Sequence, residues 1–331
     1  MQVLVTGATG FIGFHTAARL RAEGHGVRAL VRDAAKGERV LGPIGVEPGD
    51  RIEGDMSDPR AVATALDGCD AVVHSAAAVS VTTGQTDFDA NLVGTERVVG
   101  AASAMGLSTL YVSSLLAIFE PGRPVTADAP LVHGKTHYGR SKARCEAWVR
   151  ARQAEGAPIA IVYPAGVVGP DDPGMSESVK AYRSFLRGTL RCGGGNQMVD
   201  VRDLASLHTR MLEQETTGRV VAAGHFFDWD AFTALLEHVT GSSIPRITAP
   251  AWLLRGAART MDVVARATGR AMPMTGEGVE IATRMTRIAD SPEVAELGVS
   301  WRDPAETLRD LFRWFVEAGR LPASAVPNPA H

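Results

Sequence analysis

Tyr138 and Lys142 are the residues whose types and spacing best suit a chemical step. They are four residues apart in a stretch that predicts a helix, so their side chains lie one turn apart on the same face. A tyrosine gives up its proton at about pH 10, and a cation within about 4–6 Å lowers the pKa of a nearby acid by roughly 1–3 units. With its pKa lowered by Lys142, Tyr138 can give a proton to a carbonyl oxygen or take one from an alcohol. The pair therefore predicts a general acid/base, and a solvated surface pair is the alternative.

Ser113 and Ser114 offer the hydroxyl that a substrate oxygen needs for its orientation. They stand at the end of the apolar run 110–113, which predicts a buried strand. Ligands of open α/β sheets bind where such strands end, at the carboxyl edge. We expect Ser114 to orient and polarise the substrate oxygen, while the other hydroxyl supports the backbone.

A glycine-rich turn, Gly7-Ala8-Thr9-Gly10-Phe11-Ile12-Gly13, follows the first apolar run. A pyrophosphate needs backbone N–H groups close by and a helix N-terminus aimed at it. Gly7 can adopt the tight turn, and Gly10 lets the backbone approach the phosphates. Gly13 lets the helix pack closely on the strand. The glycine spacing is three and three, not the two and three of the common dinucleotide fingerprint. Together with the Tyr/Lys pair, this turn indicates nicotinamide chemistry.

The end of the second apolar run bears on the choice of cofactor. A carboxylate about 20 residues past the turn would bind the ribose 2′-hydroxyl of NAD. Val31 occupies that position, Arg32 follows it, and Asp33 comes one residue too late unless the register differs. Because a guanidinium binds phosphate through two charge-assisted hydrogen bonds, Arg32 favours NADP over NAD.

Strand and helix patterns alternate through the first half of the chain. Apolar runs predict strands at 3–5, 27–31, 71–73, 110–113 and 159–163, and helices are expected near 11–23, 58–67, 87–105 and 137–155. This alternation predicts an α/β fold, a Rossmann-type doubly wound parallel sheet. We expect a cofactor-binding domain at 1–170 with segments near 196–223 returning to it, a smaller, mainly helical substrate-binding region at 171–320, and a disordered tail at 321–331.

Composition excludes several classes of protein. The net charge of −3 gives no reason to expect nucleic acid as a partner. Three cysteines, far apart, form neither a disulfide framework nor a zinc site, so we expect no metal and a reducing, cytoplasmic environment. No apolar run approaches the roughly 18 residues of a transmembrane helix, and the chain starts without a leader pattern.

These motifs resemble the extended short-chain dehydrogenases/reductases, the NAD-dependent epimerase/dehydratase superfamily. Besides the turn, Gly54-Asp55-Met56 is similar to its adenine-side motif, 73–77 to its ribose-lining strand, and 91–95 to the helix whose Asn braces the sheet. Tyr163-Pro164 with 168–170 is similar to the segment beside the nicotinamide, and 196–203 to a segment that returns to the core. The resemblance implies catalysis by Ser114, Tyr138 and Lys142. It implies cofactor contacts from Gly7, Thr9, Gly10, Phe11, Ile12, Gly13, Arg32, Asp55, Met56, Ala76, Ala77, Asn91, Tyr138, Lys142, Tyr163, Pro164 and Val167.

The departures from the family pattern narrow the range of activities that the resemblance implies. Tyr163 stands where the family usually has Arg, and Val168 where it usually has Tyr. Leu115-Leu116 replaces the acidic pair of the sugar dehydratases, which argues against dehydration. The chain is most similar to the dihydroflavonol reductase and 3β-hydroxysteroid dehydrogenase side. By resemblance, helices near 87–105 and 137–155 would form a homodimer interface.

The stretch 251–267 predicts an amphipathic surface helix. Its charged residues fall on one face, expected to be solvated, and its apolar residues on the other; contact with a membrane surface or an acidic ligand is the alternative. The region is rich in apolar side chains, which predict an enclosed pocket for an apolar substrate: Trp252, Leu253, Leu254, Met261, Met272 and Met274. We expect His74 to be structural, and His133 and His137 to be bystanders.

The sequence thus predicts an NADP-dependent oxidoreductase that interconverts a carbonyl and a secondary alcohol on an apolar small molecule. Two alternatives stay open. One is a nucleotide-sugar epimerase that holds NAD tightly, and the other is a non-catalytic NADP-binding regulatory protein.

Overall fold

The computed structural model describes residues 1–77, 88–132, 137–268 and 276–326. At 88–89, 137–138, 262, 265–267 and 277 it describes the backbone without the side chain. Tyr138 is therefore placed by its backbone, while His133, Met272 and Met274 lie outside the described residues.

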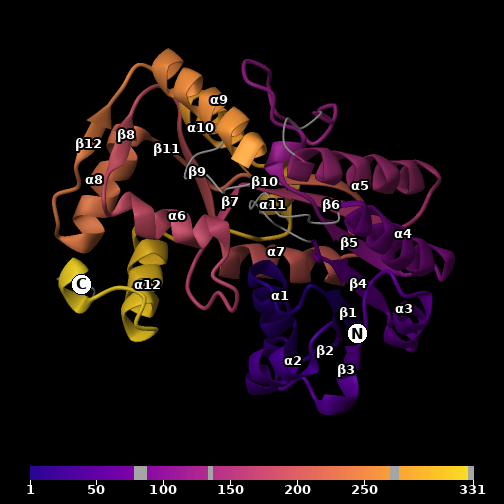
Figure 1. Ribbon diagram of the computed structural model, residues 1–331. Helices are drawn as coiled ribbons and strands as arrows, with labels where there is room; N and C mark the ends of the chain where they lie inside the picture. Colours follow the sequence, from indigo (N-terminus) through magenta and orange to yellow (C-terminus); the bar gives the residue numbers. More distant parts are fainter. Residues whose placement is uncertain (78–87, 133–136, 269–275, 327–331) are drawn as a thin grey trace.

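A seven-stranded parallel sheet forms the centre of the molecule (Figure 1), in the order β10-β6-β5-β4-β1-β2-β3. Val3 of the central strand pairs with Val27 on one side and with Ala71 on the other. This is the expected Rossmann-type doubly wound sheet, and all five strands read from the apolar runs are present. The strands are β1 (Gln2–Thr6), β2 (Gly26–Val31), β3 (Arg51–Glu53), β4 (Ala71–His74), β5 (Ser108–Val112), β6 (Ile159–Pro164) and β10 (Gly218–Ala222).

Helices cover both faces of the sheet because the strands are apolar on both sides. Val3 and Val5 pack towards α1 and α7, whereas Leu4 between them packs towards α3 and α4. A strand turns successive side chains to opposite faces, so a continuous apolar run needs a helix layer on each. The helices around the sheet are α1 (Phe11–Ala22), α2 (Ala34–Leu41), α3 (Pro59–Leu66), α4 (Phe88–Ala104), α5 (His137–Ala154) and α7 (Val201–Glu213), with short 3₁₀ turns η1 (Gly42–Ile44), η2 (Pro48–Asp50) and η3 (Leu115–Ala117).

The C-terminal region is mainly helical, with two small sheets. Its interior is an aromatic cluster of Tyr182, Phe185, Trp229 and Phe232, with ring centres 5.3 to 6.0 Å apart. One sheet is β7 (Gly166–Val168), β9 (Gly195–Asp200) and β11 (His225–Asp228), and the other is β8 (Thr189–Arg191) with β12 (Arg246–Thr248). The helices are α6 (Glu177–Phe185), α8 (Trp229–Thr240), α9 (Ala251–Thr268), α10 (Gly276–Arg284), α11 (Pro292–Glu296), α12 (Pro304–Glu317) and the 3₁₀ turn η4 (Ala323–Ala325).

Two sequence predictions for this region need correction. Disorder from residue 321 is wrong for 321–326, because Leu321 packs on the core and Val326 is buried within it. The apolar side of α9 is not simply packed away: Leu253 and Val264 are exposed, while Arg255, expected in solvent, is half-buried and donates to Thr283 Oγ1 at 3.2 Å.

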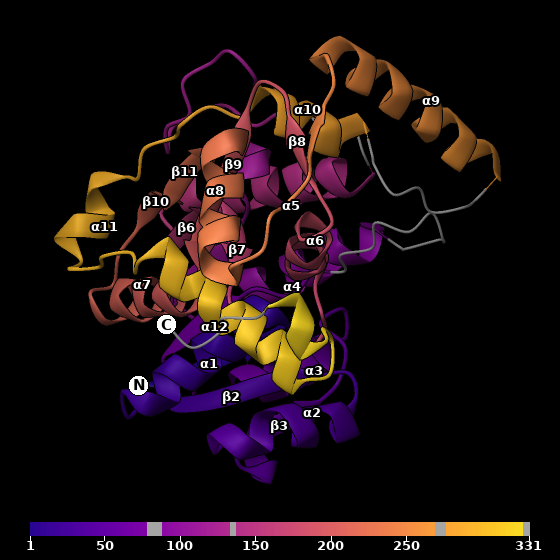
Figure 2. The same cartoon turned by 90° about the vertical axis from the view of Figure 1, so that its left-hand side faces the viewer.

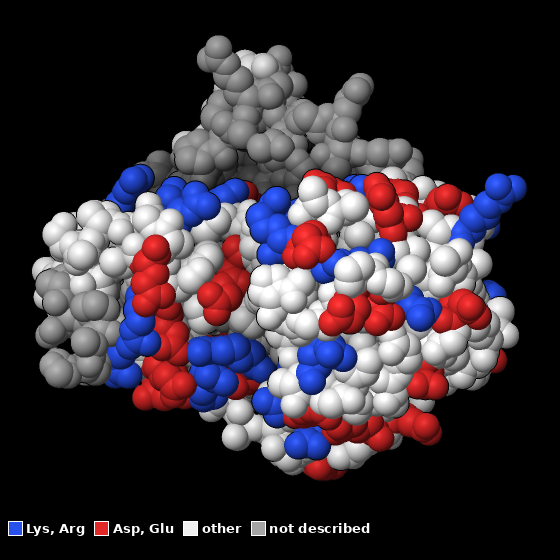
Figure 3. Space-filling view, turned by 90° about the horizontal axis from the view of Figure 1, so that it is seen from below, with Lys and Arg blue, Asp and Glu red and all other residues white. Residues whose placement is uncertain are grey.

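The charges on the face around α2 and β3 are mixed. Figure 3, which views the molecule from below, shows Lys and Arg interspersed with Asp and Glu over this face. Such a surface differs from the basic stripe typical of nucleic-acid binding. Among the described residues, no helix is both long and apolar enough to cross a membrane.

Candidate active site

The site predicted from the sequence lies at the carboxyl edge of the sheet. The strand order reverses between β1 and β4, because the chain continues from β1 to β2 on one side and from β4 to β5 on the other. Crevices at such reversals are where open α/β sheets bind their ligands. The glycine-rich turn follows β1, residues 75–77 follow β4, and Ser113 and Ser114 follow β5.

The glycine-rich turn is closely packed at two positions and open at the third. Gly7 has φ of +73°, and a Cβ there would lie 2.8 Å from the backbone N of Ala76. A Cβ on Gly13 would lie 2.2 Å from Gly7 O, so neither residue tolerates a side chain. A Cβ on Gly10 would meet only Gly7 O, at 3.2 Å, which leaves space on its other sides. Gly7 and Gly13 are thus closely packed, as a tight turn beside the end of β4 requires, whereas Gly10 leaves space for a ligand to approach the backbone.

The N-terminus of α1 is available to an anion. Gly10 is its N-cap, no side chain caps it, and its first turn carries no acidic residue. The first N–H groups of a helix have no partner within the helix and lie at the positive end of its dipole. These donors suit a diphosphate.

His74 holds the floor of the turn and takes no part in proton transfer. Its ring nitrogens lie 2.8 Å from Thr6 Oγ1 and 3.1 Å from Thr95 Oγ1, which ties β1 to α4. Complete burial, reinforced by the charge of Lys142, lowers the pKa of His74 to about 3. The imidazole is therefore neutral at working pH and structural, as expected.

The structure separates the roles of Arg32 and Asp33. Asp33 is the N-cap of α2 and accepts from the backbone N of Lys36 at 2.9 Å, so it is engaged in starting that helix. Arg32 is exposed, and within the described part of the chain its guanidinium makes no hydrogen bond or ion pair. Arg32 is thus free to bind a phosphate, whereas one of the two carboxylate oxygens of Asp33 is committed to the cap of α2.

Asp55 lies just past β3, close enough to Arg32 to be affected by its charge. Its Oδ1 accepts from Ser57 N at 2.8 Å and from Ser57 Oγ at 2.7 Å. These bonds, with a smaller effect of Arg32, hold the pKa of Asp55 below its usual range. The second carboxylate oxygen of this charged group is left for a ligand donor, while Met56 beside it packs against Gly94 of α4.

Ser113 and Ser114 point to different partners. Ser114 is half-buried at the N-cap of η3, where its Oγ accepts from Leu116 N at 3.2 Å and keeps its own proton to donate. Ser113 is buried and donates to the carboxylate of Glu146 on α5. The partner of the Ser113 hydroxyl is therefore a side chain and not the backbone that we expected, while the role of Ser114 towards the substrate stays a prediction.

Helix α5 carries Tyr138 and Lys142 and is fastened beside β5. Lys142 is half-buried, with Nζ 6.0 Å from the centre of the Tyr111 ring at the end of β5. Between the two residues, buried Ser141 accepts from Asn91 Nδ2 of α4 at 3.3 Å. Asn91 therefore braces the start of α5, whereas the resemblance implied that it braces the sheet.

A buried network that the sequence analysis missed fixes the same face of α5 further along. Glu146 has 0% exposure, and it accepts from Tyr163 OH at 2.7 Å and from Arg150 Nε at 2.9 Å, as well as from Ser113. Arg150 Nη2 donates in turn to Tyr163 OH at 2.8 Å. Tyr138, Lys142, Glu146 and Arg150 recur every four residues, and this spacing was the available signal.

This network changes what Tyr163 can contribute to cofactor binding. Burial and the Glu146 carboxylate raise the pKa of Tyr163 far above its usual value, so the phenol stays a hydrogen-bond donor. Because the ring is fully buried on the α5 side, only its backbone can face the crevice. Pro164 and Val167 are also buried, whereas Ala165 and Gly166 between them are accessible at the edge.

Two of the residues expected to line an enclosed apolar pocket face solvent. Trp252 and Leu253 are 70% and 50% exposed, while Met272 and Met274 lie outside the described residues. A cavity of about 190 Å³ lies elsewhere, lined by polar residues of α1 and α7, including Arg19 and Arg210, and by residues 298–300. Which residues line the substrate site therefore stays a prediction.

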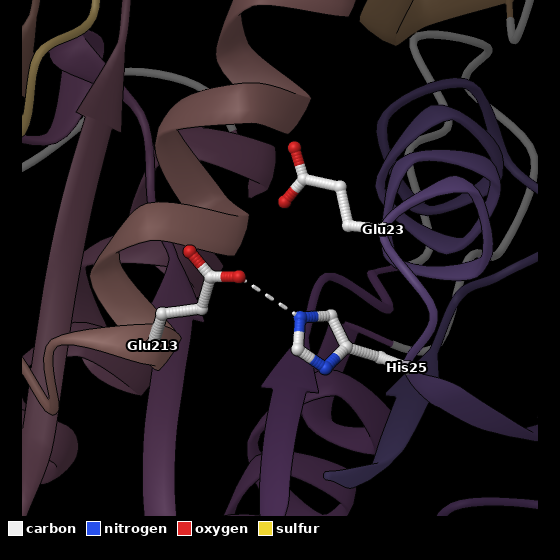
Figure 4. A group of neighbouring side chains, drawn as sticks. All are labelled: Glu23, His25 and Glu213. Carbon is white, nitrogen blue, oxygen red and sulfur yellow. Dashed lines mark hydrogen bonds and ion pairs between the residues drawn. The ribbon is translucent and has the colours of Figure 1, made fainter.

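A second group of titratable residues lies away from this edge (Figure 4). Ligand atoms of Glu23, His25 and Glu213 all lie within 4.8 Å of one another, and His25 Nε2 is 3.1 Å from Glu213 Oε1. Each carboxylate also has an arginine: Arg19 pairs with Glu23, and Arg210 with Glu213 at 2.9 Å. Since the arginines already neutralise both carboxylates, we interpret this group as an ion-pair cluster that joins the end of α1 to the end of α7.

Comparison with known proteins agrees with this geometry. The profile of the NAD-dependent epimerase/dehydratase family matches residues 3–224. Sterol demethylase protein B of Methylococcus capsulatus is 29% identical, over 97% of this chain and 100% of its own. A 4-hydroxy-2-methyl-3-oxo-4-farnesyl-3,4-dihydroquinoline-1-oxide ketoreductase of Stigmatella aurantiaca is 27% identical, over 100% of both chains. The crystal structure of gox2253 matches with a TM-score of 0.79 at 26% identity, over 96% of this chain and 99% of that one. The chain therefore belongs to the NAD-dependent epimerase/dehydratase family, as an enzyme of the extended short-chain dehydrogenase/reductase type.

Proposed function

We propose that this enzyme interconverts a carbonyl and a secondary alcohol on an apolar small molecule, with NADP as its cofactor. One observation carries the proposal. The Ser114 hydroxyl, with a proton free to donate, stands at the carboxyl edge of β5, and α5 is fixed to that same strand end through Glu146 and Lys142. A carbonyl oxygen placed there can receive hydrogen bonds from Ser114 and from the first turn of α5.

The proposed roles of the residues follow from their chemistry. Ser114 donates to the substrate oxygen and polarises it. Tyr138 gives that oxygen a proton in reduction and removes one in oxidation, and Lys142 favours the phenolate by its charge. When bound, the nicotinamide cofactor supplies or accepts the hydride.

The described residues fit the cofactor. The open side of Gly10 and the uncapped N-terminus of α1 suit the diphosphate. Arg32 suits a 2′-phosphate, and the free oxygen of Asp55 suits the adenine amine. The guanidinium of Arg32 at the end of β2, unpaired among the described residues, supports NADP over NAD, although the family is named for NAD.

The apolar substrate is supported by the relatives and by composition. One relative is named for a sterol demethylase and another for the reduction of a farnesylated ring ketone. The C-terminal region supplies many apolar side chains and few amides, whereas a nucleotide sugar needs several polar partners for its diphosphate and base. A homodimer through α4 and α5, which pack side by side (Figure 1), belongs to the same proposal by resemblance.

The test is turnover with a panel of apolar ketones and aldehydes and with nucleotide sugars, each with NADPH or NADH. We expect apolar carbonyls to consume NADPH, with faster turnover than NADH gives, and turnover lower by about 100-fold or more in Tyr138→Phe. Copurified NAD together with epimerisation of a nucleotide sugar, without net change in reduced cofactor, would overturn the proposal in favour of an epimerase. Binding of NADP without turnover on any carbonyl or alcohol would instead support the regulatory alternative.

A further inference from the structure

Helix α9 turns an apolar face to solvent. Trp252, Leu253, Val263 and Val264 are 70%, 50%, 63% and 40% exposed. At about 100° per residue they share one side of the helix with small or neutral residues, and no charged residue falls within that arc. Among the side chains that the structure describes, the exposed residues of this arc are Trp252, Leu253, Gly256, Ala257, Thr260, Val263 and Val264.

The opposite side of α9 attaches it to the molecule. Ala258 is fully buried, Leu254 and Met261 are half-buried, and α9 packs on α10. Arg255 adds a hydrogen bond to Thr283 of α10 at 3.2 Å. In Figure 2, α9 projects at the edge of the molecule, beyond α10 and away from the sheet. The apolar arc is thus not needed to hold the helix in place, and its exposure calls for another explanation.

The charge of α9 is opposite to that of the chain. The helix contains Arg255, Arg259 and Arg266 against the single acid Asp262, whereas the whole chain has a net charge of −3. By helical spacing the arginines fall along one boundary of the apolar arc, and Arg259 is exposed there. An apolar face with a tryptophan, bordered by arginines, is the composition of helices that lie in the surface of a bilayer containing anionic lipids.

A second copy of the chain is a weaker candidate for this face. An 18-residue helix is about 27 Å long, and a strip about 10 Å wide along it covers roughly 270 Å² on each copy. Two such strips bury roughly 540 Å², well below the roughly 1,000 Å² expected of a specific interface. A bilayer surface needs no matching shape, so a projecting helix can enter it alone.

We propose that α9 docks this enzyme on an anionic lipid surface, with its axis parallel to the surface and the arc from Trp252 to Val264 in the headgroup region. The helix would lie on the membrane and not cross it. The docking goes beyond the proposed reaction and does not depend on it.

The experiment is flotation of the full chain with vesicles of phosphatidylglycerol and phosphatidylcholine, or of phosphatidylcholine alone. Wild type should float with the anionic vesicles and less with the neutral ones, and added salt should weaken flotation. Leu253→Asp and Val264→Asp should each weaken binding by about tenfold or more, because each side chain is exposed and its burial in lipid is lost. Met105→Asp is the matched control, since it places the same charge on another exposed apolar residue, at 53%.

Folding and oligomeric state are measured on the same variants, by thermal unfolding and by sedimentation velocity. No flotation of wild type, equal flotation with both vesicles, or an equal loss in Met105→Asp would overturn the proposal. Dissociation of a wild-type dimer by Leu253→Asp would assign the face to a second copy and overturn it as well. Flotation is read without substrate, so an enzyme inactive on every carbonyl would refute the proposed function and leave this test intact.

Discussion

Removal of the Glu146 carboxylate should destabilise the enzyme more than any surface change. In Glu146→Ala, the Tyr163 hydroxyl, the Ser113 hydroxyl and the Arg150 guanidinium lose their shared acceptor. Tyr163 is fully buried, and the Arg150 side chain is only 17% exposed, so water replaces little of what is lost. Breaking a buried pair from one side costs about 3–5 kcal/mol, and we expect a loss in this range.

A graded series separates the carboxylate's charge from its shape. Glu146→Gln keeps the size and one acceptor oxygen, so its cost should be about 1–3 kcal/mol, the range for a hydrogen bond to a charged group. Tyr163→Phe in both backgrounds completes a double-mutant cycle, and the coupling energy should be about 0.5–3 kcal/mol because the two groups are in contact. Glu155→Gln, whose partner Arg152 is on the surface, is the matched control and should stay within about 0.5 kcal/mol.

The measurement is urea unfolding followed by circular dichroism at neutral pH, with the apo enzyme. If Glu146→Ala cost less than about 1 kcal/mol, or no more than Glu155→Gln, the carboxylate would not be the buried centre that this reasoning requires. A destabilised but folded Glu146→Gln should also have lower turnover, because the hydrogen bond that joins Ser113 to α5 loses its charged acceptor.

Tyr138→Phe should lower turnover by about 100-fold or more while NADP affinity, measured by calorimetry, stays near that of wild type; unchanged turnover would remove the phenol from the mechanism. Arg32→Ala should weaken NADP far more than NAD in the same calorimeter, and a wild type that binds NAD more tightly would contradict the argument. Gly13→Ala should abolish cofactor binding or folding because its Cβ would lie 2.2 Å from Gly7 O, whereas Gly49→Ala, with nothing within 4 Å, should be silent. Burial lowers the pKa of His208 to about 3 from its usual 6.5, so below pH 6.5 the unfolded chain binds a proton that the folded chain refuses; the unfolding free energy should therefore fall between pH 6.5 and 3, with a shallower slope in His208→Gln.

Local patterns were sufficient for the sheet and for the glycine-rich turn. The runs at 3–5 and 71–73 are apolar on both faces, and only a strand between two helix layers accommodates that. The position of Asp33 depended on the register of β2, and its hydrogen bond to Lys36 N places it as the N-cap of α2, two residues past the end of the strand. The choice between NADP and NAD stays a prediction.

Contacts between distant segments could not be read from such patterns. Arg302, just before α12, pairs with Asp203 of α7 at 2.8 Å, yet no pattern in the sequence connects the two residues. The exposed face of α9 was also missed, because helical periodicity separates two faces without telling which one a neighbour covers. Here α9 packs on α10 with Ala258 buried, and the more apolar arc faces solvent.

The departure at Tyr163 illustrates why a site should be judged by its contacts. In the sequence, Tyr163 stands at a position where the family usually has an arginine. In space, a guanidinium is still present, since Arg150 reaches both the Tyr163 hydroxyl and the Glu146 carboxylate from two turns along the helix that carries Lys142. The buried Glu146 carboxylate thus has a cation, Arg150, and a hydroxyl donor, Tyr163. Its charge is compensated by a residue of the same helix, α5. The substitution at 163 therefore does not argue against an intact Ser114, Tyr138 and Lys142 site.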